Sequence, residues 1–225
     1  GAVGDALVNK DVNTAFADFV RAKINQIVDS PDVAALLCPQ DHPIGSKRIC
    51  VDSNYYATYN RANVQLCDVR SNPIQQITAS GVQTETDLHE LDVLVLATGF
   101  DAMTGALLNI DITGEKNQSL KEAWAAGPVT YLGLGVAGFP NLFTVTGPGS
   151  PSVLSNMLVS IEQHVDWISH LIEHMQSADK DRVEVESDAQ SHWVEHVNEV
   201  ANQTLFPEGG SWYLGANVEG KPRVF

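Results

Sequence analysis

The sequence is poor in positive charge, and this shortage excludes several classes of partner. Its 225 residues include 13 Lys and Arg against 28 Asp and Glu, which gives a formal net charge of −15. A field of that sign repels nucleic-acid backbones and anionic membrane surfaces. We therefore expect no nucleic-acid partner and no membrane partner. An anionic ligand would need a local patch of positive charge.

Cysteine is scarce, and long apolar runs are missing. Cys38, Cys50 and Cys67 form no Cys-x-x-Cys pair. Their odd number argues against a disulfide framework or a zinc site and indicates the reducing cytoplasm. No apolar run reaches the roughly 18 residues of a membrane span. The N-terminus lacks the basic and apolar regions of a signal peptide, and because it has no initiator Met we expect the natural chain to start earlier.

Apolar residues make up 44% of the chain, enough for a core, and their spacing predicts several helices. We expect helices over residues 12–28, 31–37 and 189–205, and a helical turn over 55–60. The longest helix should follow Ser150, with Ser150 as its N-cap and Pro151 as its first residue. Its apolar seam, which we expect to face a core, consists of Leu154, Leu158, Ile161, Val165, Ile168, Ile172 and Met175.

Strands are predicted between these helices. Residues 47–51 and 63–69 are strand candidates, and residues 74–77 and 82–84 flank Ala79-Ser80-Gly81 as a β-hairpin. The continuous apolar run over 91–96 is typical of a parallel strand that is buried on both faces. The pattern therefore predicts an α/β protein.

One glycine motif is interpreted as a turn only. The run from Gly133 to Gly138 matches the dinucleotide fingerprint G-x-G-x-x-G. That fingerprint works when a helix starts within it, so that the helix N-terminus meets the pyrophosphate. Here Phe139-Pro140-Asn141 follows at once, so these glycines are expected to ease a tight turn.

Three further motifs belong together. Ala97-Thr98-Gly99 follows the apolar run, Lys47-Arg48 places two cations side by side in an acidic chain, and a Gly-Pro-Gly-Ser-Pro loop begins at Gly147 and runs on to Asn156. With these motifs the chain closely resembles the flavin-containing Baeyer–Villiger monooxygenases, class B flavin monooxygenases of the phenylacetone and cyclohexanone monooxygenase group. The resemblance covers nearly the whole chain.

The resemblance implies a partial Rossmann-like flavoprotein with two dinucleotide-binding domains and a helical insertion. Residues 1–43 would be the helical insertion of the NADP domain, residues 46–91 the rest of that domain, and residues 92–225 the C-terminal part of the FAD domain. The family's two true fingerprints, its F-x-G-x-x-x-H-x-x-x-[WP] signature and its catalytic aspartate do not occur in these 225 residues. We expect them in a missing N-terminal half that binds FAD and NADP.

The resemblance also assigns roles to particular residues. Lys47 would contact the 2′-phosphate of NADPH, and Arg48 would be the catalytic cation over the flavin. Trp212 would close over NADP. The other residues that the resemblance places at the site are Thr98 and Gly99 beside the cofactors, Ser152, Val153 and Leu154 at the substrate, and Met157 near the flavin ring.

The implied reaction consumes NADPH and O2 and converts a ketone to an ester or lactone through a C4a-peroxyflavin. A guanidinium suits such a step because it stays protonated and offers several fixed donors to an oxyanion. One alternative is a flavin monooxygenase that oxidises nitrogen or sulfur, which is not expected to share both Lys47-Arg48 and the loop at Gly147. Another is a fragment that is catalytically silent when isolated.

The histidines are not expected to bind a metal. His170 and His174 lie four residues apart on a predicted helix, as do His192 and His196. No third ligand is arranged with either pair, so surface positions are favoured. The preferred ketone and the oligomeric state are left open by the sequence.

Overall fold

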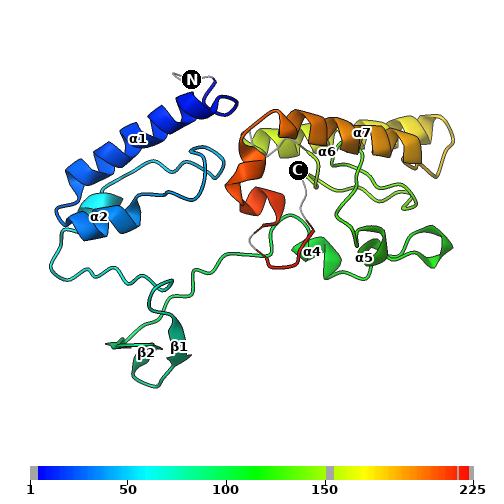
Figure 1. Cartoon of the computed structure of the whole chain (residues 1–225). Helices are drawn as coiled ribbons and strands as arrows, with labels where there is room; N and C mark the ends of the chain where they lie inside the picture. The colour runs from blue at the N-terminus through cyan, green and yellow to red at the C-terminus, as the bar shows by residue number, and fades with distance from the viewer. Residues whose placement is uncertain (1–4, 151–154, 217, 223–225) are drawn as a thin grey trace.

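The computed structural model describes residues 5–150, 155–216 and 218–222. Figure 1 shows two helical lobes and a small sheet, which hangs below them on two irregular connections. The first lobe holds α1, Lys10–Ile27, α2, Pro31–Leu37, and α3, Tyr55–Thr58. The second begins with α4, Gly105–Leu108, and contains the two long helices α6, Met157–Ser177, and α7, Ser187–Asn202.

The first lobe forms because α1 and α2 are capped locally and share one apolar core. The Asn9 side chain accepts hydrogen bonds from the first turn of α1, and Ser30 caps α2 with Pro31 in its first turn. The shared core consists of Ile24, Val28, Ala34 and Cys38. The predicted helices over 12–28 and 31–37 and the turn at Tyr55 are therefore confirmed.

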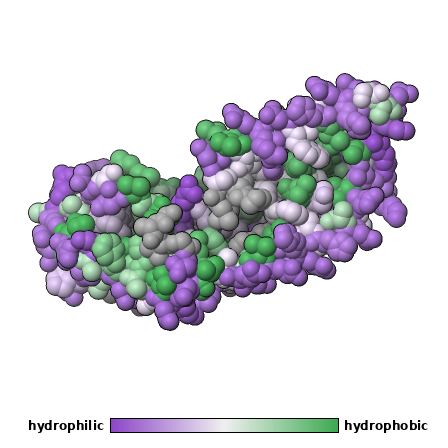
Figure 2. All heavy atoms as spheres, turned by 90° about the horizontal axis from the view of Figure 1, so that it is seen from above, coloured by the Kyte–Doolittle hydropathy of each residue, from purple (hydrophilic) through white to green (hydrophobic). Residues whose placement is uncertain are grey.

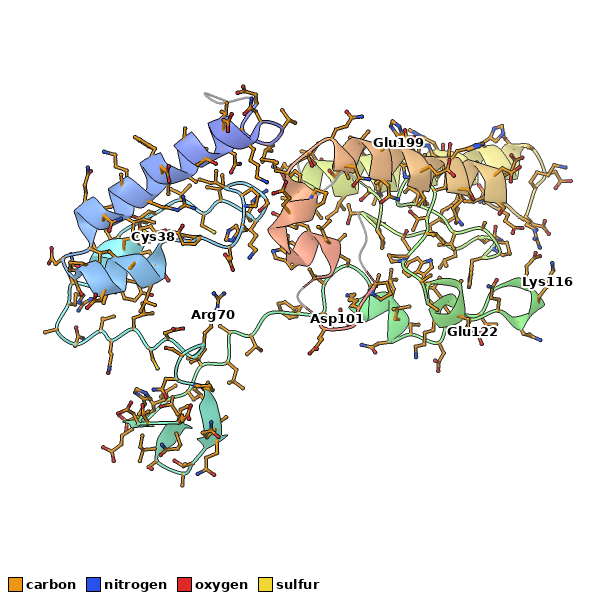
Figure 3. The ribbon with its side chains drawn as sticks, viewed as in Figure 1. Cys38, Arg70, Asp101, Lys116, Glu122 and Glu199 are labelled. Atoms are coloured by element: carbon orange, nitrogen blue, oxygen red, sulfur yellow. The ribbon has the colours of Figure 1, made fainter. Side chains whose placement is uncertain are left out.

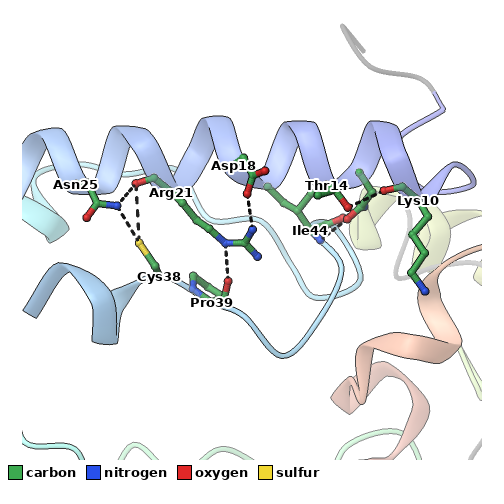
Figure 4. A network of polar contacts seen from close by, with 9 residues as sticks. Lys10, Thr14, Asp18, Arg21, Asn25, Cys38, Pro39 and Ile44 are labelled. Carbon is green, nitrogen blue, oxygen red and sulfur yellow. Dashed lines mark hydrogen bonds and ion pairs between the residues drawn. The ribbon is translucent and has the colours of Figure 1, made fainter. Parts of the chain in front are cut away.

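The loop after α2 is tied back to α1 by polar side chains. Buried Asn13 donates to the carbonyl oxygen of Ile44 at 2.9 Å and accepts from its amide at 3.1 Å. Arg21 Nε donates to the carbonyl oxygen of Pro39 at 2.9 Å (Figure 4). These bonds fix the path of the loop that leads to Lys47.

The sheet is antiparallel and has the order β1-β2-β3. Its strands are β1, Ile74–Ile77, β2, Gly81–Thr84, and β3, Leu88–Glu90. Ile77 pairs with Val82 across the turn, which confirms the predicted hairpin. The third strand was not predicted, because Leu88-His89-Glu90 is too short to show an alternating pattern.

Three predicted strands are wrong. Residues 47–51, 63–69 and 91–96 have no strand pairing in the described part of the chain. The run over 91–96 is also exposed rather than buried, with Val93 at 76% and Val95 at 78% exposure. A buried parallel strand needs a neighbouring strand and covered faces, and the described residues supply neither to this run.

The second lobe has its own apolar core. It packs α5, Leu120–Ala123, against the loops around Val136 and Phe139, and Trp124 fills the space between them. A capping box between Ser119 and Glu122 starts α5, after the 3-10 turn η1, Glu115–Asn117. The predicted helix over 189–205 is confirmed as α7, which carries Val194 and Val197 half-buried.

Two expectations about the long helix are wrong. It begins at Met157 with Asn156 as its N-cap, not after Ser150, and the predicted first residue Pro151 lies outside the described residues. Its predicted seam is only partly covered: Leu158, at 70% exposure, Val165 and Ile172 are exposed, whereas Ile161, Ile168 and Met175 are half-buried. The buried residue of α6 is His164, because the adjacent face packs on the loops of the lobe. Leu154 lies outside the described residues.

The segment after α7 joins the two lobes. The Leu205 amide donates to the carbonyl oxygen of Leu7 at 2.8 Å, and Lys10 pairs with Glu208 at 2.9 Å. This segment forms two 3-10 turns, η3, Phe206–Gly209, and η4, Trp212–Leu214. Seen from above, the lobes flank a depression (Figure 2). None of the helices described is long and apolar enough to cross a membrane.

Candidate functional site

The Lys47-Arg48 segment is held against η3 by the residue before it. Ser46 is fully buried, and its hydroxyl donates to the carbonyl oxygen of Pro43 at 2.6 Å. A Cβ atom at Gly209 would lie 2.5 Å from the Ser46 side chain, so only glycine permits this approach. The contact packs the residue before Lys47 against Gly209, which lies three residues before Trp212 in the chain.

Asp41 lies among three basic side chains, His42, Lys47 and Arg70. Its carboxylate contacts His42 at 2.7 Å and Arg70 at 3.4 Å. The hydrogen bond from His42, assisted by the charge of Lys47, lowers the pKa of Asp41 below its ordinary value. Arg70, whose side chain extends from the connection below the first lobe (Figure 3), was missed by the sequence reasoning because it lies far from Lys47 in the chain. Lys47 and Arg70 together bring two cations near one carboxylate, a local excess of positive charge in an acidic protein.

Lys47 is half-buried and Arg48 is exposed. The backbone of both residues follows the buried Ser46 anchor, so their position is fixed while their charged ends can reach solvent. That combination suits the binding of a phosphate or another anion.

Trp212 is presented at the surface by buried neighbours. Its indole is 41% exposed, whereas Ser211 and Tyr213 on either side are buried. The Ser211 hydroxyl accepts from the Tyr213 amide at 3.3 Å and starts η4. The indole meets the Tyr213 ring edge to face, with 4.2 Å between centroids. An exposed indole on such a fixed turn can stack on a flat ligand.

The Thr98-Gly99 turn is exposed and open. Gly99 has φ +81°, and a Cβ atom built on it would meet nothing within 4 Å. Just beyond it, Asp101 forms an ion pair with Lys221, whose side chain is only 10% exposed. This pair ties the Gly-Lys-Pro stretch near the end of the chain to the entrance of the second lobe (Figure 3).

The loop that starts at Gly147 is strongly restrained up to Ser150. The Thr146 amide donates to His164 Nδ1 at 2.9 Å, so the imidazole is neutral and carries its proton on Nε2. Burial lowers the pKa of His164. The predicted substrate residues Ser152, Val153 and Leu154 lie outside the described residues, while Met157 is exposed at the start of α6.

The G-x-G-x-x-G match is a turn, as predicted. Gly133 has φ +70°, and Tyr131 bridges to Gly135 across the turn. No helix is present from 136 to 150, all of which are described, so no helix N-terminus is offered to a pyrophosphate.

The histidine pairs are at the surface, as predicted. His170 and His174 on α6 and His192 and His196 on α7 are all exposed. No group of three side chains that could hold a metal ion occurs among the residues described.

Comparison with known proteins identifies close relatives over nearly the whole chain. It is 44% identical over 93% of its length to the 2-oxo-Δ3-4,5,5-trimethylcyclopentenylacetyl-CoA monooxygenase of Pseudomonas putida, and 41% identical over 97% to the cyclohexanone 1,2-monooxygenase of an Acinetobacter species. It is also 41% identical over 98% to the phenazine N-monooxygenase PhzNO1 of Lysobacter antibioticus. These matches span 38%, 40% and 40% of the relatives, so the chain corresponds to about 40% of their length. No protein-family model matches the chain.

Solved structures give the same result. The chain superposes on a closed crystal structure of cyclohexanone monooxygenase with a TM-score of 0.93 at 42% identity. It superposes on the complex of OTEMO with FAD and NADP with a TM-score of 0.92 at 43% identity. Each match covers 98% of this chain and 41% of the other. Over nearly its whole length the chain is therefore similar to a part, about 40% in length, of enzymes named Baeyer–Villiger and cyclohexanone monooxygenases.

Proposed function

We propose that this chain is part of an NADPH- and O2-dependent flavin monooxygenase that converts ketones to esters or lactones. The observation that carries the proposal is the 41% identity with cyclohexanone 1,2-monooxygenase over 97% of the chain. The site geometry supports it, because two cations follow Ser46, which packs against Gly209 three residues before Trp212. Arg48 and Trp212 are exposed and Lys47 is half-buried, so a ligand can reach them.

The described residues fit FAD and NADP. Lys47 and Arg70 supply positive charge for phosphate, Trp212 supplies an exposed aromatic face, and the turn at Gly99 leaves open space for a flat group. When bound, NADPH supplies the reducing equivalents and FAD activates oxygen. In this proposal Lys47 binds the 2′-phosphate and Trp212 covers the nicotinamide nucleotide.

Arg48 is proposed as the catalytic cation. Its guanidinium holds its charge at neutral pH and can donate to an oxyanion that develops on the attacked ketone. A preorganised donor of this kind in a water-poor site is worth about 3–4 kcal/mol, or about 100–1,000-fold in rate. Ser152, Val153, Leu154 and Met157 are proposed to line the ketone and flavin side of the same site.

The domain boundaries follow from the same proposal. Residues 1–43 are assigned to the helical insertion of an NADP domain, 46–91 to the rest of that domain, and 92–225 to the FAD domain, both Rossmann-like. The exposed apolar run over 91–96 supports this division, since it is the kind of sequence that a parallel sheet buries. The partners are a ketone, O2 and an N-terminal half that carries the dinucleotide fingerprints. The odd cysteine count supports a cytoplasmic location.

The test replaces Arg48 in the protein at the full length of its relatives, loaded with FAD. With Arg48→Ala, lactone formation from cyclohexanone should fall about 100–1,000-fold because the oxyanion loses its cation. Arg61→Ala removes an exposed arginine and should leave the rate unchanged. Undiminished lactone formation by Arg48→Ala would overturn the catalytic assignment.

A second candidate is oxygenation of a ring nitrogen. The chain is 41% identical to a phenazine N-monooxygenase over 98% of its length. This identity equals that with cyclohexanone 1,2-monooxygenase. The two are separated by incubating the full-length protein with cyclohexanone and with phenazine in turn. A lactone alone supports the first function, and an N-oxide alone supports the second.

A further inference from the structure

Two glycine loops of the second lobe pack backbone against backbone. The Gly147 amide donates to the carbonyl oxygen of Gly133 at 3.0 Å, and the Thr144 hydroxyl donates to the same oxygen at 2.8 Å. A Cβ atom at Gly133 would lie 2.5 Å from the Cβ of Ser150, and one at Gly147 would lie 2.7 Å from the Gly133 oxygen. Gly133, in the G-x-G-x-x-G match, therefore allows the loop that starts at Gly147 to pack closely against it.

A single buried hydroxyl connects these loops. Thr130 is 2% exposed, and its Oγ1 donates to the carbonyl oxygen of Pro148 at 2.6 Å. Thr130 Oγ1 also accepts a hydrogen bond from the Gly133 amide at 3.1 Å. Because a hydroxyl has one proton, the bond from Gly133 directs that proton towards Pro148.

The next carbonyl is held from a different element. Trp193, on α7, donates from Nε1 to the carbonyl oxygen of Gly149 at 3.1 Å. Its ring packs edge to face on Tyr131, with 6.4 Å between centroids, which fixes the indole. The carbonyl groups of two consecutive residues, Pro148 and Gly149, are thus held from two sides.

These bonds are not explained by the helix that follows. Helix α6 starts only at Met157 and has its own cap, Asn156, whose side chain accepts from the Leu158 amide at 3.1 Å. A loop that merely leads to a capped helix needs no buried hydroxyl and no indole to orient its carbonyls. The loop residues held in this way lie directly before the segment to which the proposed function assigns the ketone.

We propose that Thr130 and Trp193 are positioning residues that fix Pro148 and Gly149 and thereby set how the segment after Ser150 meets the ketone. The assignment rests on the proposed function, which places Ser152, Val153 and Leu154 at the substrate. Thr130 and Trp193 act through the loop and contact neither substrate nor cofactor in this proposal. They determine which bond of an unsymmetrical ketone lies in line for migration.

The test uses the FAD-loaded protein at the full length of its relatives. Thr130→Val and Trp193→Phe remove the two donors with little change of shape, and Thr130→Ser keeps the hydroxyl. Thr84→Val is the matched control, because Thr84 is also 2% exposed and its hydroxyl also donates to a carbonyl, that of Asp87, and accepts from an amide. The readout is the ratio of the two lactones formed from 2-methylcyclohexanone, which does not depend on the fraction of folded protein.

We expect the lactone ratio to shift in Thr130→Val and in Trp193→Phe, with kcat/KM for the ketone lower by about tenfold or more. Thr130→Ser should restore the ratio, and Thr84→Val should leave it unchanged. An unchanged ratio in both loop variants would overturn the proposal while the proposed function stood. If the unaltered protein forms no lactone from any ketone, the proposed function fails instead.

Amide hydrogen exchange tests the positioning role of Thr130 and Trp193 without an activity measurement. Exchange of the amides in residues 144–150 should be faster in Thr130→Val and in Trp193→Phe than in Thr84→Val. Equal exchange in all three variants would show that these donors do not hold the loop.

Discussion

At the scale of single residues, buried His164 is the group whose protonation most directly affects the restrained loop. Burial lowers its pKa, and its Nδ1 can accept from the Thr146 amide only while it is unprotonated. In the unfolded chain the imidazole binds a proton below about pH 6.5. The unfolded state therefore binds more protons, and the free energy of unfolding falls as pH drops from about 6.5 through the lower folded pKa.

Urea unfolding at about pH 7.5 and about pH 5.5 measures this contribution. His164→Gln keeps an acceptor and should lose less stability between the two pH values than the native chain. His174→Gln, at an exposed position of the same helix, should lose as much as the native chain. An equal loss in His164→Gln and in the native chain would show that His164 does not titrate as argued.

Candidate site residues could be named from the sequence where a motif was continuous, and their roles stay predictions. Lys47, Arg48 and Trp212 could be named because each lies in a short motif that the family resemblance assigns. Arg70 and Trp193 could not, because their importance arises from contacts with residues 29 and 44 positions away. No local pattern records such contacts.

At the scale of elements, the close approach of the two glycine loops leaves no room for a side chain at Gly133 unless the loops shift. Gly133→Ala places a Cβ atom 2.5 Å from the Ser150 Cβ, at a backbone φ of +70°. Gly220→Ala tests the backbone conformation alone, because its φ is +74° and a Cβ atom there meets nothing within 4 Å. We expect the free energy of unfolding to fall by about 1–3 kcal/mol more in Gly133→Ala than in Gly220→Ala. Equal losses would mean that the loops can separate at no cost.

Elements that depend on local signals were predicted well. The helix from Lys10 and the hairpin around Gly81 are determined by caps, periodicity and turn residues that lie within each segment. The run over 91–96 was predicted as a buried strand and is exposed, because its burial depends on partner strands that its own residues cannot specify. The start of the long helix was misplaced at Ser150, since Asn156 caps it equally well in chemical terms.

At the scale of the whole molecule, the exposed apolar run over 91–96 should dominate the solution behaviour of the 225-residue chain. An exposed apolar segment without strand pairing promotes association with other chains. Val93→Lys combined with Val95→Lys should lower the fluorescence of a hydrophobic dye and reduce sedimenting oligomers. Val51→Lys, at a single residue that is 92% exposed, should change neither. Dye binding that is unaffected by the double substitution would place the exposed apolar surface elsewhere.

Oxygen labelling tests whether the full-length protein inserts an atom of O2 into a ketone. The full-length protein, loaded with FAD, is given NADPH, cyclohexanone and 18O2, and the products are analysed by mass spectrometry. We expect a lactone that carries one 18O atom, and we expect its formation to fall about 100–1,000-fold in Arg48→Ala. Consumption of NADPH without any lactone, or a lactone free of 18O, would contradict this expectation.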